Sequence, residues 1–191
     1  MPVPPPLGIL AGLLAAGLLL APTAVATPSA LRAPIAARDC PGRDLVPTVD
    51  DLGAVRAAIV CLHSQIRAER GLPSLAENAT LRRAATAHST DMVASGYFEH
   101  TGPSGTTLVD RLFGAHYVGH NQTWVVGENL AWATGTDATA AGVMREWMAS
   151  PGHRANILRR SYRDVGVGIV TGVPSDGTAG ATFTADFGGR R

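Results

Sequence analysis

The sequence contains no lysine, so its 16 basic residues are all arginine. Only 16% of its residues are charged, and the formal net charge at pH 7 is +1. No basic stripe and no polybasic run is visible along the chain. This balance argues against nucleic acid as a partner and against electrostatic attachment to a membrane surface.

Charge is also absent from the beginning of the chain, because no charged side chain occurs before Arg32. Residues 7–20 are almost wholly apolar, and Ala24-Val25-Ala26 supplies small residues typical of a cleavage site. We therefore predict that residues 1–26 are a signal peptide and that the mature protein, secreted from the cell, begins at Thr27. The alternative is an uncleaved anchor, since residues 1–6 lack the usual arginine or lysine. The apolar stretch is, however, shorter than a membrane-spanning helix requires.

Cysteine is scarce, and Cys40 and Cys61 are the only two in the chain. In an oxidising compartment an isolated pair predicts one disulfide, which would stabilise the fold by roughly 3 kcal/mol. Two buried free thiols are the alternative. A structural zinc site of four cysteine or histidine ligands is not indicated, because no Cys-x-x-Cys spacing is present.

Alanine and proline dominate residues 27–47, which show no periodicity and are interpreted as an N-terminal arm. Residues 48–191 are predicted to form one globular domain. Apolar spacing and capping residues predict a helix over residues 48–71 with the stripe Val55, Ile59, Leu62 and Ile66. Further helices are expected over residues 78–96 and 107–113 and after Thr136, and strands over residues 124–133, 165–169 and 182–187. Segregated helices and antiparallel strands indicate an α+β fold.

Histidine and glutamate are the residues most able to carry chemistry here. His88 lies on an apolar helix stripe and is interpreted as a hydrogen-bonded core residue, whereas His63 lies off the stripe and is expected to be solvated. His100 and His153 are each placed in a loop beside glycine, where a side chain can face a cleft. Glu128 lies within an apolar run, which is costly for an unpaired carboxylate. No Gly-x-Ser-x-Gly, His-Glu-x-x-His or phosphate-loop motif occurs.

Four blocks of sequence occur in an order that resembles the CAP superfamily: cysteine-rich secretory proteins, antigen 5, pathogenesis-related 1 proteins and their bacterial relatives. The resemblance extends over about residues 58–188. The blocks are Phe98-Glu99-His100, Gly127-Glu128-Asn129-Leu130-Ala131-Trp132, Trp147-Met148-Ala149-Ser150-Pro151-Gly152-His153-Arg154-Ala155-Asn156-Ile157-Leu158 and Val165-Gly166-Val167-Gly168.

The resemblance implies a three-layer α-β-α sandwich with a central antiparallel sheet and a cleft. His100, Glu128 and His153 match three members of the cleft set, which in some relatives holds a divalent metal. Ser150 stands where animal members have a second acid, and the nearest acid, Glu146, is expected to point elsewhere on its helix. Two imidazoles and one carboxylate suit zinc with an open coordination position, so zinc is the favoured cofactor.

The leading hypothesis is a non-enzymatic extracellular domain whose cleft binds a metal, a small polar molecule, a lipid or a cell-surface ligand. No catalytic residue is assigned in this hypothesis. The alternative is a secreted hydrolase that uses Ser150 or Ser104 with His153 or His100 and with Glu128, or a metal-activated water. After removal of the signal peptide we expect a monomer without a membrane span.

Overall fold

The structure is a computed structural model that describes residues 39–175 and 179–190. The predicted signal peptide and most of the N-terminal arm lie outside the described residues. The elements, in chain order, are α1 (Leu52–Ala68), β1 (Ala76–Glu77), α2 (Ala79–Ser95), α3 (Leu108–Gly114), β2 (Trp124–Ala133), the 3₁₀ helix η1 (Gly135–Ala138), α4 (Ala140–Ala149), α5 (Pro151–Leu158), β3 (Asp164–Thr171) and β4 (Ala181–Arg190).

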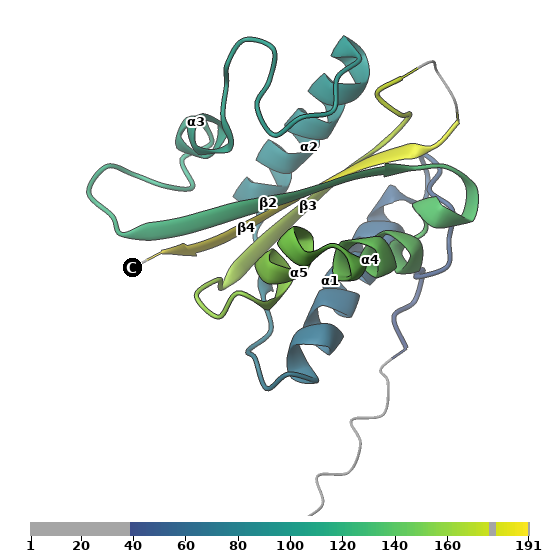
Figure 1. Ribbon diagram of the computed structural model, residues 1–191, viewed down its shortest axis with the longest axis horizontal. Helices are drawn as coiled ribbons and strands as arrows, with labels where there is room; N and C mark the ends of the chain where they lie inside the picture. Colours follow the sequence, from purple (N-terminus) through teal and green to yellow (C-terminus); the bar gives the residue numbers. More distant parts are fainter. Residues whose placement is uncertain (1–38, 176–178, 191) are drawn as a thin grey trace, which may run out of the picture. The chain divides into compact units, whose positions relative to one another are not determined.

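A four-stranded sheet in the order β1-β3-β4-β2 forms the middle layer. The long strands β3, β4 and β2 pair in antiparallel fashion, while the two-residue β1 joins β3 in parallel. Helices α2 and α3 lie on one side of this sheet, and α1, α4 and α5 lie on the other (Figure 1). The predicted three-layer sandwich is thus confirmed, and the strands predicted over residues 165–169 and 182–187 form β3 and β4, which pair with each other.

The two faces of β4 differ in polarity. Phe183, Ala185 and Phe187 point towards the α1, α4 and α5 layer and are fully buried in the main apolar core. The alternate residues Thr184 and Asp186 are equally buried but face the opposite layer. Because side chains alternate along a strand, one strand contributes both to an apolar core and to a polar interior.

Two glycines of β3 allow α2 to approach the sheet backbone to backbone. A Cβ atom at Gly166 would lie 2.1 Å from the backbone nitrogen of Arg82, and one at Gly168 would lie 2.2 Å from that of Thr86. Any side chain larger than hydrogen would push the helix away. The alternating glycines noted in the sequence therefore fix the distance between α2 and the sheet.

Helix α1 begins later and turns a different face inward than its sequence predicts. Asp51 is the N-cap in place of Thr48, and its carboxylate accepts a 2.7 Å hydrogen bond from the Thr48 hydroxyl. The buried positions centre on Val55, Ile59, His63 and Arg67, whereas Leu62 and Ile66 are only partly buried.

The expectation that His63 is solvated is wrong. Its ring is fully buried between Trp147 and Phe187, with centroid distances of 6.0 and 5.5 Å, and Nδ1 donates a 2.9 Å hydrogen bond to the Ile59 carbonyl. Helix α1 packs against both α4 and β3, so its inner face is wider than the apolar stripe.

The segment that contains His153 is a helix and not the predicted loop. Ser150 ends α4 and also caps α5, and Pro151 occupies the first turn of α5, where its missing N–H costs nothing. The start of α4 also differs from the prediction, because Thr139 and not Thr136 is the N-cap. The Thr139 hydroxyl accepts a hydrogen bond from the Gly142 N–H at 3.1 Å.

Cys40 and Cys61 form the predicted disulfide, which joins the segment before α1 to the middle of that helix. Cys40 is fully buried. Within residues 39–175 and 179–190 no helix is long and apolar enough to cross a membrane.

Candidate functional site

His100 lies in the loop between α2 and α3, as predicted, and local hydrogen bonds shape this loop. The Gly105 N–H donates to the Gly102 carbonyl at 2.8 Å, and the Gly102 N–H donates to the Thr106 carbonyl at 3.0 Å. Helix α3 follows with a capping box between Thr107 and Asp110. These contacts hold the His100 imidazole against β2 while leaving its side chain 58% exposed.

Glu128 lies in the middle of β2, and its carboxylate is almost completely buried. Its Oε1 accepts a 2.7 Å hydrogen bond from His100 Nδ1, and its Oε2 accepts a 2.5 Å ion-paired bond from Arg111 Nη2 of α3. The same guanidinium donates through Nη1 to the His100 carbonyl at 3.0 Å. Arg111 therefore supplies the positive charge that a buried Glu128 requires.

These contacts set the ionisation of the pair. Burial by itself raises the pKa of Glu128, but the hydrogen bond with His100 and the charge of Arg111 outweigh it, so the net shift is downward. The same hydrogen bond raises the pKa of His100 against the opposing effect of burial. An ionised Glu128 and a readily protonated His100 are mutually stabilising.

Two further buried groups surround the Glu128 carboxylate. His88 of α2 places Nε2 3.9 Å from Glu128 Oε2, and a 3.0 Å hydrogen bond joins the same nitrogen to the Glu99 carbonyl. Burial lowers the pKa of His88. The prediction of a hydrogen-bonded core histidine is therefore right, and this histidine also adjoins the site.

Asp186 is the second of these groups and lies directly opposite Glu128 in the β2–β4 pairing. Directly paired residues of antiparallel strands share one face of the sheet, so the two carboxyl groups are neighbours. Asp186 is fully buried, and neither of its carboxyl oxygens has a hydrogen-bond partner among the described residues. Burial and then the nearby charge of Glu128 raise the pKa of Asp186 well above its usual value.

His153 approaches from the opposite layer, on α5, and its carbonyl accepts a 3.1 Å hydrogen bond from the Asn129 side chain. Burial and then the charge of His100 lower the pKa of His153. The two imidazoles therefore interact electrostatically near the edge strand β2. Nδ1 of His153 is buried without a hydrogen-bond partner among the described residues.

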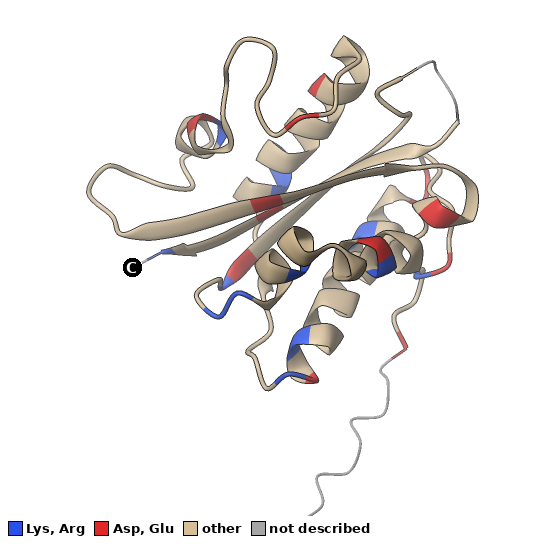
Figure 2. Ribbon diagram, in the orientation of Figure 1, with Lys and Arg blue, Asp and Glu red and all other residues tan. Residues whose placement is uncertain are grey.

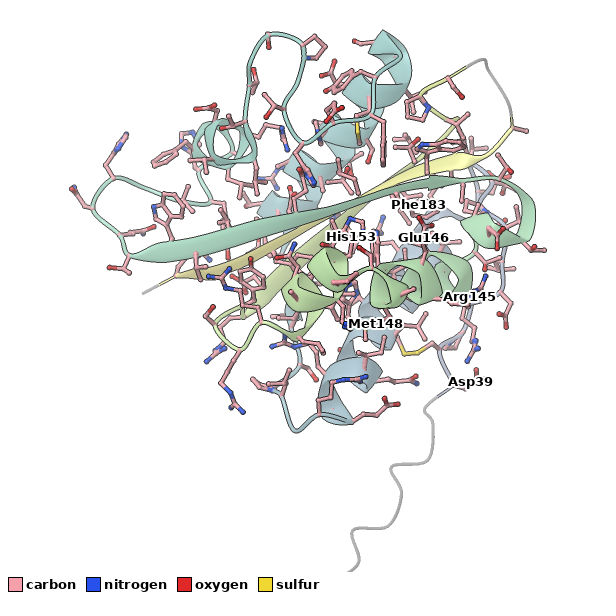
Figure 3. All side chains as sticks on the ribbon, in the orientation of Figure 1. Asp39, Arg145, Glu146, Met148, His153 and Phe183 are labelled. Carbon is pink, nitrogen blue, oxygen red and sulfur yellow. A yellow bond between two sulfur atoms is a disulfide. The ribbon has the colours of Figure 1, made fainter. Side chains whose placement is uncertain are left out.

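Glu146 acts on His153 as well, because the charge of its carboxylate raises the pKa of that histidine. Both residues lie on the α4 and α5 side of β2 (Figure 3). The expectation that Glu146 points elsewhere on its helix stays a prediction. Glu146 also lines a hollow of about 530 Å³, together with Trp132, Asp137 and Arg145.

A metal ion would find imidazole nitrogens here more readily than carboxylate oxygens. Both oxygens of Glu128 are engaged, by His100 and by Arg111, and within the described ranges no three His, Cys, Asp or Glu side chains are close enough to hold an ion together. His100 Nε2 and the unpartnered Nδ1 of His153 would be the nitrogen donors for such an ion. Glu128 then acts as the partner that orients His100, as carboxylates commonly do behind ligating histidines.

Arg111 and Asp186 are the site residues that sequence reasoning missed. Arg111 lies on a short helix that has no motif, and only the folded chain brings it to Glu128. The sequence did contain a signal for Asp186, because a carboxylate within the strand-forming run of residues 182–187 predicts a buried acid that needs a partner.

A family model described as "Cysteine-rich secretory protein family" (CAP) matches residues 60–187. The chain belongs to this family. An uncharacterized protein of Bacillus subtilis (strain 168), YkwD, is 32% identical over 141 residues, which are 73% of this chain and 49% of YkwD. An uncharacterized membrane protein of the same organism, YlbC, is 34% identical over 111 residues, 58% of this chain and 30% of YlbC. The chain thus spans half or less of the length of these curated relatives.

Solved structures agree with this assignment. The crystal structure of an extracellular protein containing an SCP domain from Bacillus anthracis str. Ames matches with a TM-score of 0.56 and 31% identity, over 74% of this chain and 43% of that chain. An outer surface protein from Borrelia burgdorferi matches with a TM-score of 0.58 over 76% of this chain and 97% of that one. At 19% identity the latter shows the fold alone.

Proposed function

We propose that this CAP protein is a secreted, non-enzymatic binding domain whose cleft, formed by His100, Glu128, Ser150 and His153, takes a divalent metal, with zinc favoured. The observation that carries the proposal is the pair of imidazoles at the edge of β2. Glu128 holds His100 by its Nδ1 and leaves Nε2 available, while His153 has a buried nitrogen without a partner in the described part of the chain.

The donor set determines which metal suits this cleft. Imidazole nitrogen suits zinc, whereas magnesium and calcium require several oxygen ligands, which Glu128 cannot supply while it is bound to Arg111. A zinc ion held by two imidazoles would keep open positions and would supply Lewis acidity towards an anionic or carbonyl ligand. The 530 Å³ hollow beside Glu146 is large enough to hold such a ligand.

The alternative of a serine hydrolase gains no support from the geometry. The Ser104 hydroxyl is hydrogen-bonded to Thr106 at 2.8 Å, and among the described residues neither Ser104 nor Ser150 forms a hydrogen bond with a histidine. A nucleophilic serine needs such a bond to lose its proton. A lipid ligand would need an apolar hollow, and the hollow lined by Glu146 also includes the charged residues Asp137 and Arg145.

Calorimetric titration with zinc tests the proposal. The wild type should bind saturably, and His100→Ala or His153→Ala should each weaken binding at least about tenfold, because each removes one of two ligands. His120→Ala is the matched control, since that ring stacks on Phe113 away from the cleft. Binding that neither cleft substitution weakens would refute this site.

The same titration repeated at several pH values sharpens the test. A histidine must lose its proton to ligate zinc, and Glu128 raises the pKa of His100 above the usual 6.5. Zinc affinity should therefore already decline as the pH falls towards 6.5. Glu128→Gln, which removes the charge behind His100, should move this decline to lower pH. An unchanged profile in that variant would contradict the orienting role of Glu128.

A further inference from the structure

Arginine side chains gather at one end of the sheet, in the segment that follows α5 and at the end of β4. Arg159, Arg160 and Arg163 come from the loop between α5 and β3, and Arg190 comes from the end of β4. All four are exposed. Figure 2 shows these basic segments around the point where β3 begins and β4 ends. A chain with a net charge of only +1 thus concentrates positive charge in one place.

Three of these arginines line a hollow of about 510 Å³, which we call the arginine hollow. Its walls are Arg159, Ser161 and Arg163 of the loop, Thr123 and Trp124 at the start of β2, and Arg190 of β4. Its described lining contains no acidic side chain. Asp164 lies 3.7 Å from Arg190 and lines a smaller adjoining hollow of about 320 Å³.

Backbone contacts fix the loop that carries these arginines. The Arg163 N–H donates to the Gly188 carbonyl at 2.8 Å. A Cβ atom at Gly189 would lie 2.3 Å from the Ser161 carbonyl oxygen, so only glycine lets the loop rest on β4. The positive charges are therefore held on an ordered frame, which lowers the entropic cost of binding an anion between them.

The guanidinium groups are oriented by the protein and still have donors to spare. Arg159 uses Nε to reach the Ser161 hydroxyl, and Arg163 uses Nη1 to reach two backbone carbonyls. Arg190 donates from Nη1 to the Tyr117 carbonyl and lies over the Tyr117 ring. Each guanidinium has five N–H donors, so most of them remain available for a ligand.

The chemistry of the lining favours one class of ligand. A phosphate monoester carries close to two negative charges at pH 7 and three acceptor oxygens, which suits several convergent guanidinium groups better than a single carboxylate does. The half-buried indole of Trp124, braced edge-on by Phe113 at 5.9 Å, and the hydroxyls of Thr123 and Ser161 suit a sugar ring. We propose that the arginine hollow, formed by Arg159, Arg163, Arg190 and Trp124, binds the phosphate and ring of a phosphorylated sugar.

Calorimetry on the intact chain with glucose 1-phosphate tests this proposal, with inorganic phosphate and glucose as separate titrants. We expect saturable binding of glucose 1-phosphate that is tighter than that of either titrant. Arg159→Gln and Arg163→Gln should each weaken it about tenfold or more, since each removes a charge-assisted hydrogen bond. Arg159→Lys should retain part of the affinity because it keeps the charge but loses the planar donors.

The controls distinguish a built site from general attraction of anions. Arg70→Gln removes an exposed arginine at the end of α1 and should leave binding unchanged. Fluorescence of Trp124 should saturate at the same concentration as the heat signal, and Trp124→Phe should abolish that change. Thermal unfolding of each variant confirms that it is folded.

Three results would overturn the proposal. The first is the absence of saturation at millimolar glucose 1-phosphate. The second is equal binding by the wild type and by the Arg159→Gln/Arg163→Gln double variant. The third is binding to vesicles that contain phosphatidylglycerol without binding of the free sugar phosphate, which would make the arginines a membrane contact instead.

Discussion

The two faces of strand β4 are both fully buried, yet they are built on different principles. On one face, Phe183 and Phe187 pack into a continuous apolar core with Trp147 and Ile59. On the other, Thr184 bonds to Ser89 of α2 at 2.8 Å, and Asp186 lies against Glu128. Apolar packing needs only shape and volume, whereas each buried polar group needs a partner.

This difference separates stability from function within a single strand. The apolar face buries large side chains, which is the main favourable contribution to folding. The polar face places one further carboxyl group, one arginine and two histidines around Glu128, and such clusters with perturbed pKa values are characteristic of functional sites. The close contact at Gly166 holds α2, which carries His88, against the polar face.

The largest effect should come from breaking that close contact. Gly166→Ala would place a methyl group 2.1 Å from the Arg82 nitrogen and 2.3 Å from the Leu81 carbonyl carbon, both of them backbone atoms. We expect a loss of at least about 4 kcal/mol in the free energy of unfolding, because the helix must move from the sheet. Urea denaturation followed by circular dichroism measures this loss.

Gly152→Ala is the matched control for this substitution. A Cβ atom there meets nothing within 4 Å, and the residue lies in the first turn of α5. The variant should be as stable as the wild type or more stable by up to about 1 kcal/mol. Equal stability of the two variants would show that α2 does not depend on the glycines of β3.

The fold was predictable where local signals agree with tertiary packing. Asn78 caps α2 and Gly96 ends it, as their residue types predict. The signals fail where packing overrides them. The sequence Ser150-Pro151-Gly152 has the composition of a loop, but proline in a first helical turn is compatible with α5. Likewise the inner face of α1 includes His63 and Arg67, which no apolar stripe predicts.

The candidate site was predictable only in part. His100, Glu128 and His153 were identified by resemblance to a family, and folding brings His100 against Glu128 and His153 near enough for the charge of His100 to lower its pKa. Arg111 could not be predicted, because its contact depends on how α3 meets the sheet. The arginine hollow could not be predicted from the sequence either. Arg190 comes close to Arg159 and Arg163 only in the folded chain, where β4 returns across the sheet.

A second prediction concerns His63, the one histidine on the apolar face. Burial lowers the pKa of His63 from 6.5 to about 4, so the folded state keeps the ring neutral while the unfolded state takes up a proton below pH 6.5. Stability from this residue is therefore complete above pH 6.5 and decreases as the pH falls to about 4. The decrease should reach about 3 kcal/mol.

Replacement by a residue that does not titrate isolates this contribution. His63→Leu keeps an apolar side chain of similar size, and its unfolding free energy should fall less steeply between pH 6.5 and 4 than that of the wild type. The difference between the two urea-denaturation profiles removes the contributions of the other histidines. Parallel profiles would mean that His63 is solvated in the folded protein.

The smallest effect is expected on the polar face, at Asp186. Its pKa is raised in the folded state by burial and by the charge of Glu128, so the unfolded chain releases this proton at a lower pH than the folded chain does. The stability that the protonated form provides is complete below about pH 4 and is lost as the pH rises through the raised pKa.

Asp186→Asn remains neutral at every pH and places an amide N–H donor next to Glu128. The variant should therefore match the wild type near pH 4 and exceed it by about 1 kcal/mol at pH 7, by urea denaturation. Asp186→Leu is also neutral at every pH, so its stability relative to that of the wild type should rise by a similar amount between pH 4 and pH 7. If Asp186→Asn is less stable than the wild type at pH 7, then Asp186 is ionised in the folded protein. The polar face would then hold two charges where the geometry accommodates one.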